Sequence, residues 1–81
     1  MSETVLDLRG LKCPLPALKT RKALTRMAPG DVIRVECTDA LAAIDIPHLV
    51  AETRDHLEEQ SRADDVLVFR IRKAGNEAKT A

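Results

Sequence analysis

Arg9-Gly10-Leu11-Lys12-Cys13-Pro14-Leu15-Pro16 marks the point where an apolar strand gives way to a helix. Gly10 allows the backbone to turn, and the two prolines open a run of residues with helical spacing. The spacing predicts that Cys13 is the N-cap of this helix, whose side chain faces the free N–H groups of the first turn. We therefore expect Cys13 at the rim of the fold, where an anion is stabilised.

The residues around this stretch predict a strand, a helix and a second strand. Residues 5–9 place Leu6 and Leu8 on one face, as in a half-buried strand. Residues 32–38 alternate in the same way. Because residues 14–28 have helical spacing and the connections are short, we expect a right-handed parallel βαβ unit. The predicted apolar stripe of the helix consists of Ala17, Leu18, Leu24 and Met27, with Thr20 and Ala23.

The second half of the chain leaves one alternative open. A second helix is predicted to begin at an Asp45 cap, with Pro47 in its first turn and residues 40–44 as a looser lead-in turn. Residues 66–73 predict a strand with Phe69 on its buried face. Residues 56–62 suit either more helix or a strand that forms a C-terminal hairpin with a turn at 63–65. We expect a single domain over residues 1–74 and a flexible tail over 75–81.

Composition narrows the classes of function. The 81 residues include 13 basic and 13 acidic side chains, so no net charge favours direct nucleic-acid binding. The single aromatic residue, Phe69, also argues against stacking on bases. No apolar run approaches the roughly 20 residues that span a bilayer, and no signal-like segment is seen at the start. We expect a cytoplasmic monomer that contacts neither membrane nor nucleic acid.

The two cysteines predict different roles. A thiol at a helix N-terminus beside cations has a lowered pKa, and Arg9 and Lys12 flank Cys13. Since Pro14 and Pro16 lack N–H groups, only the Leu15 N–H could donate to the sulfur. The alternative for Cys13 is a small apolar filler, and this is the favoured interpretation of Cys37, which shares a strand face with two apolar residues.

Other charged residues are weaker candidates. The cations of the first helix form either a solvated face or a docking patch: Lys19, Arg21, Lys22 and Arg26. Asp45 is interpreted first as a helix cap and second as a partner contact. His48 and His56 lack metal-ligand spacing to either cysteine, so we predict no metal and no cofactor.

Several motifs in order resemble the TusA (SirA-like) sulfur-carrier family, over about residues 5–74. They are Leu6–Pro16, Arg21–Leu24, Pro29–Asp31, Thr38-Asp39, Asp45–Pro47 and Phe69–Lys73. The resemblance implies an α+β fold: a two-layer βαβαββ sandwich with two helices on one face of a mixed four-stranded sheet. Within its Cys-Pro-x-Pro motif, Cys13 takes the reactive position, while Gly10, Pro14 and Pro16 position it.

The resemblance also implies a function. Cys13 would accept sulfane sulfur as a persulfide from a cysteine desulfurase or rhodanese-like donor, then pass it to a sulfur-acceptor protein. Family acceptors serve transfer-RNA thiolation, molybdenum-cofactor enzymes and sulfur oxidation. The alternatives are a non-catalytic interaction or regulatory module and a redox-sensing thiol.

The chain departs from the family pattern at three places. Family members often have proline where Ala40 stands and a polar residue at Ile44. They also often carry a glycine-histidine pair where this chain has Arg54-Asp55, so a usual helix stop is missing.

Overall fold

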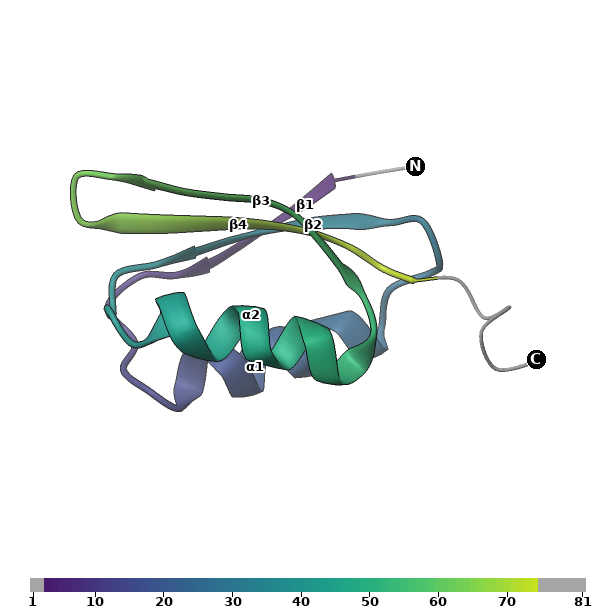
Figure 1. The fold of residues 1–81 in the computed structure, drawn as a ribbon, viewed down its shortest axis with the longest axis horizontal. Helices are drawn as coiled ribbons and strands as arrows, with labels where there is room; N and C mark the ends of the chain where they lie inside the picture. The colour runs from purple at the N-terminus through teal and green to yellow at the C-terminus, as the bar shows by residue number, and fades with distance from the viewer. Residues whose placement is uncertain (1–2, 75–81) are drawn as a thin grey trace.

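The computed structural model describes residues 3–74 as two layers, with a four-stranded sheet covered on one face by two helices (Figure 1). In chain order the elements are β1 (Glu3–Leu8), α1 (Leu15–Thr25), β2 (Val32–Cys37), α2 (Ala42–Thr53), β3 (His56–Ala63) and β4 (Val66–Arg72). This order confirms the expected βαβαββ sandwich. The tail predicted over residues 75–81 lies outside the described residues.

β1 and β2 are parallel neighbours, as the predicted βαβ unit requires. Their register pairs Glu3 with Val32 at one end and Leu8 with Cys37 at the other. Both strands therefore end at the same edge of the sheet. The turn after β1 and the loop after β2 meet at this edge, where the Gly10 N–H, at φ 87°, donates to Thr38 Oγ1 over 2.8 Å.

The sheet has the order β1-β2-β4-β3, with β4 antiparallel to both of its neighbours. The predicted apolar face of β4 is confirmed, because Phe69 and Ile71 are fully buried under the helices. Cys37 of β2 is also fully buried, and this burial raises the pKa of its thiol to about 11. The core role predicted for Cys37 is confirmed.

α1 is shorter than the predicted helix, and its predicted stripe is confirmed except at Leu18. The buried residues of α1 are Pro16, Thr20 and Leu24, spaced four apart, while Ala17, Ala23 and Met27 are partly buried against the core. Leu18, which was expected to face the core, is 54% exposed. Since Pro16 lies in the first turn, where no helical N–H is needed, its ring can take the buried place. Leu18 is thereby turned toward α2 and solvent.

α2 begins earlier than predicted, so the Asp45 cap is wrong. The helix starts at Ala42 with Leu41 as N-cap and no side-chain cap, and Pro47 lies inside it. The residues expected to form a loose turn instead make backbone hydrogen bonds to the carbonyl three residues earlier. For example, the Ala43 N–H donates to the Ala40 carbonyl over 3.1 Å. Asp45 is therefore on the helix, with its carboxylate free of a capping role.

The end of α2 settles the open alternative in favour of the hairpin. Arg54 adopts the left-handed conformation, φ 63°, and its N–H donates to the Ala51 carbonyl while the Asp55 N–H donates to the Val50 carbonyl. These two bonds form a Schellman motif, which ends the helix. Asp55 is buried and accepts bonds from Thr53 Oγ1 and the Ala74 N–H. β3 follows, and its hairpin with β4 turns at Asp64 and Asp65.

No helix in the part of the chain that the structure describes is long and apolar enough to cross a membrane.

Thr20 has a buried hydroxyl with no hydrogen-bond partner among the described residues. We predict that Thr20→Val, which has nearly the same shape, raises the free energy of unfolding by about 1 kcal/mol, because it removes an unsatisfied polar group. Chemical denaturation checks this. Thr25→Val is the matched control, since the Thr25 hydroxyl donates to the Lys22 carbonyl over 2.7 Å and its loss should not stabilise the protein. A destabilised Thr20→Val would contradict the prediction.

Arg54 holds a conformation that glycine adopts with less strain. We predict that Arg54→Gly raises the free energy of unfolding by up to about 1 kcal/mol, because relief of left-handed strain outweighs the added freedom of the unfolded chain. The control is Ala51→Gly in the last turn of α2, which should cost about 1 kcal/mol. If urea titration shows both glycines to be equally destabilising, the strain at Arg54 is not significant.

Candidate functional site

The turn between β1 and α1 holds Cys13 at the exposed rim of the sheet. The Leu11 N–H donates to the Leu8 carbonyl over 3.2 Å, and the Leu15 N–H donates to the Lys12 carbonyl over 2.8 Å. The N-cap of α1 is Pro14. Cys13 is thus one residue outside the cap, so the predicted N-cap role is wrong. The Leu15 N–H, expected to face the sulfur, is already used by the turn.

Cys13 is held by two aspartates, Asp39 from the loop between β2 and α2 and Asp45 from the first turn of α2. Asp39 Oδ2 accepts the Cys13 N–H over 2.6 Å, while its other oxygen accepts the Leu41 N–H over 3.0 Å. These backbone bonds lower the pKa of the Asp39 carboxyl. Asp45 Oδ2 lies 2.9 Å from Cys13 Sγ, which donates its hydrogen. The reactive thiol is therefore bonded to a carboxylate rather than to helix N–H groups.

The pKa of the Cys13 thiol is raised above its ordinary value, which reverses the prediction. The hydrogen bond to Asp45 is the largest cause, followed by loss of solvation and by the negative charges of Asp45 and Asp39. Each cause favours the neutral thiol over the thiolate. Asp39 and Asp45 lie 26 and 32 positions from Cys13 along the chain, so local sequence could not reveal their effect.

The two flanking cations act on acids rather than directly on the sulfur. Arg9 Nε lies 2.9 Å from Asp7 Oδ1, and bonds from Arg9 lower the pKa of Asp7 to about 2. The charge of Lys12 contributes to lowering the pKa of Asp39. A role for Arg9 or Lys12 in stabilising a thiolate or contacting a partner stays a prediction.

A groove of about 290 Å³ begins at Cys13 and runs between α1 and α2. Ala17 and Leu18 line its α1 side, and Leu49 lines its α2 side. Farther along, Glu52 forms an ion pair with Arg21, whose Nη2 lies at 2.9 Å, and is also contacted by His48 Nε2 at 3.3 Å. Among the predicted cations of α1, the structure brings Arg21 to this groove. It leaves Lys19, Lys22 and Arg26 on the exposed surface of α1, where docking is untested.

Exposed apolar side chains gather on the first turns of both helices. We call Leu15, Leu18, Leu41 and Ile44 the apolar rim. Ile44 is the most exposed of them, at 68%. Of these residues, only Ile44 was noted from the sequence as a departure from the family pattern, while Leu18 was assigned to the apolar stripe of the first helix. Leu18 lines the groove together with Cys13, and large apolar side chains that stay exposed in one region favour contact with another protein.

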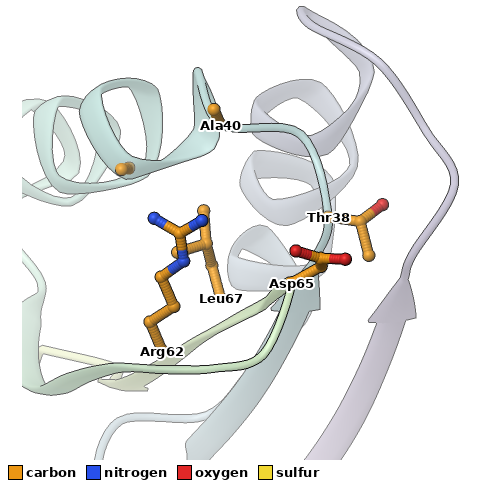
Figure 2. Close-up of a pocket in the computed structure, with 6 residues that line it drawn as sticks. Thr38, Ala40, Arg62, Asp65 and Leu67 are labelled. Carbon is orange, nitrogen blue, oxygen red and sulfur yellow. The ribbon is translucent and has the colours of Figure 1, made fainter.

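A larger hollow of about 380 Å³ lies beside the loop after β2 and does not include Cys13. Figure 2 shows Arg62 extending from the β3–β4 hairpin toward Ala40, with Leu67 below the loop and Asp65 across the hollow. The Thr38 hydroxyl at its margin already accepts the Gly10 N–H. Since this hollow contains no thiol or imidazole, its size does not make it the better candidate site.

The described residues, 3–74, bring no three His, Cys, Asp or Glu side chains together as metal ligands. Cys37 is buried away from Cys13, so each is a free thiol. The chemistry that this site can perform is exchange at a single exposed sulfur, next to two carboxylates.

Comparison with known proteins identifies relatives over nearly the whole chain. The model of a family described as sulfurtransferase TusA matches residues 4–73. A Neisseria meningitidis protein named provisionally as a sulfur carrier is 41% identical over 69 residues, covering 85% of this chain and 93% of the relative. The sulfur carrier protein TusA of Allochromatium vinosum is 35% identical, covering 85% and 91%. That of Pseudomonas aeruginosa is 31% identical, covering 88% and 90%.

The raised thiol pKa predicts slow alkylation of Cys13 at neutral pH. We expect the iodoacetamide rate, followed by mass spectrometry of the Cys13 peptide, to reach half its maximum above the pH of about 8.5 typical of a free cysteine. An N-acetylcysteine amide measured in parallel gives the reference, and Cys37 should stay unmodified in the folded protein. A midpoint at or below the reference would contradict the arrangement of Asp45 and Asp39.

Proposed function

The chain belongs to the TusA family of sulfur carriers, and we propose that it carries sulfur as a persulfide on Cys13. The observation that supports this most is the position of Cys13: an exposed thiol at the mouth of the α1–α2 groove, surrounded by the apolar rim. A carrier must present its sulfur to two proteins in turn, so the atom has to lie on the surface. A small surface groove also fits a partner's reactive segment better than an enclosed substrate.

The proposed reaction exchanges bonds between sulfur atoms. The Cys13 thiolate attacks the terminal sulfur of a donor persulfide, an S–S bond forms, and the donor S–S bond breaks. The inner sulfur of the donor persulfide leaves as a thiolate and takes up the proton that Cys13 lost. In the second half, an acceptor thiolate attacks the outer sulfur and Cys13 leaves as the thiolate. Atoms and electrons balance in both steps, so no cofactor is required.

The proposed partners are a cysteine desulfurase or rhodanese-like donor and a sulfur-acceptor protein. We infer that they dock on the apolar rim, which lies on the first turns of α1 and α2, and on the exposed cations of the first helix. The carrier would act as a monomer in the cytoplasm, with residues 1–74 as one unit. Its sulfur would serve transfer-RNA thiolation, a molybdenum-cofactor enzyme or another sulfur pathway.

Loading of Cys13 is the direct test. After incubation with a cysteine desulfurase and cysteine, we expect a gain of about 32 Da, one sulfur atom, located on the Cys13 peptide and removed by a reductant. Intact-protein and peptide mass spectrometry measure it. Cys13→Ser should abolish the gain, because no other exposed thiol lies among the described residues.

The matched control is Cys37→Ala, which keeps Cys13 and should still be loaded. A wild-type protein that gains no sulfur, or a Cys13→Ser protein that keeps the gain, would contradict the proposal. Peroxide that forms a stable sulfenic acid on Cys13, without any uptake of sulfane sulfur, would favour a redox-sensing thiol instead.

A further inference from the structure

We propose that Asp45 makes this carrier selective for a sulfur donor that brings a positive charge beside its persulfide. The inference rests on the proposed function, in which Cys13 accepts the sulfur. It assigns Asp45 a specificity-determining role in place of the capping role predicted from the sequence.

The geometry leaves a negative charge at the sulfur without a counter-charge. Asp45 Oδ2 lies 2.9 Å from Cys13 Sγ. Within residues 3–74, Asp45 forms no salt bridge, although Arg21 and His48 line the same groove. Both of these side chains are paired with Glu52, at 2.9 and 3.3 Å. Arg21, the permanent cation of the groove, is therefore paired with a carboxylate other than the one that contacts the sulfur.

The remaining charged groups around Cys13 also leave the sulfur next to negative charge. Asp39 lies on the side of the β2–α2 loop, where it accepts the Cys13 and Leu41 N–H groups. Lys12, the neighbouring cation in the turn, acts on Asp39. The groups that influence the sulfur most are thus two carboxylates, and they raise the thiol pKa. The free carrier is held mainly as the neutral thiol, which attacks a persulfide poorly.

A cation that docks beside Asp45 removes the hydrogen-bond acceptor of the thiol and offsets the negative charge that disfavours the thiolate. It pairs with the carboxylate, so the thiol loses its acceptor, and it stabilises the thiolate that performs the attack. Cys13 then forms a bond to the outer sulfur of R–S–SH, the S–S bond of the donor breaks, and the inner sulfur leaves as R–SH with the proton that Cys13 lost. A donor that carries negative charge meets like charge at Asp45 and Asp39, so its approach is disfavoured.

Two small persulfides of opposite charge test this without a protein donor. Cysteamine persulfide carries an ammonium group, and glutathione persulfide carries a net negative charge. The rate at which each adds one sulfur to Cys13 is measured by mass spectrometry at low ionic strength, and the cationic-to-anionic ratio is taken. We expect Asp45→Asn to lower this ratio by about three- to tenfold. Salt should lower the wild-type ratio as well, through screening. Comparing ratios between proteins cancels the intrinsic reactivities of the two donors.

Glu59→Gln is the matched control, because it removes one negative charge from an exposed position on the edge strand β3. It should keep the wild-type ratio. If the wild type is loaded by both donors but Asp45→Asn leaves the ratio unchanged, the inference is overturned while the sulfur-carrier function stands. An equal loss of the ratio in Glu59→Gln would also overturn it, since net charge would then suffice. If neither donor loads the wild type, the proposed function itself fails.

Discussion

The bridge made by Asp39 is the interaction on which the site depends. Its two oxygens accept the N–H groups of Cys13 and Leu41, which belong to turns far apart in the chain. Parallel pairing of β1 and β2 brings these turns to one edge of the sheet, and the Gly10 bond to Thr38 joins them again. The sulfur is thereby fixed between the first turns of α1 and α2, at the mouth of their groove. Asp45 reaches the sulfur only because α2 begins before it, at Ala42.

The sulfur of a carrier must be accessible to partners, yet it must not react with other molecules. The two carboxylates beside Cys13 limit its reactivity. The thiol is exposed, so any electrophile or oxidant in solution can reach it. Hydrogen bonding to Asp45 and the nearby charge of Asp39 disfavour the thiolate, which is the form that reacts. In the proposed function, a partner that docks on the exposed apolar rim would control this reactivity by what it places beside Asp45. A thiol at a helix N-terminus would differ, because the helix dipole would stabilise its thiolate whether or not a partner is bound.

Local signals in the sequence were sufficient for the βαβ unit and for β4, whereas the complete two-layer sandwich was implied by the family resemblance. Period-two spacing in β2 and β4 identified the buried faces around Phe69, and short connections implied the βαβ unit. Local signals were insufficient for β3, because helix propensity continues past the last turn of α2 while Arg54 ends the helix in a conformation usually left to glycine. Cys13 was identified as the exposed thiol, but the direction of its pKa shift was wrong. That direction depends on Asp39 and Asp45, whose contacts with Cys13 exist only after folding.

The central claim is that the Asp45 carboxylate accepts the hydrogen of the Cys13 thiol. A ¹³C NMR titration that follows the Cys13 Cβ and the Asp45 carboxyl carbon in the same spectra tests it most directly. We expect the Cys13 Cβ to titrate above the pH of about 8.5 typical of a free cysteine, and the Asp45 carboxyl carbon to shift as the thiol loses its proton. A Cys13 Cβ that titrates below that pH, with no accompanying shift of the Asp45 carbon, would contradict the hydrogen bond.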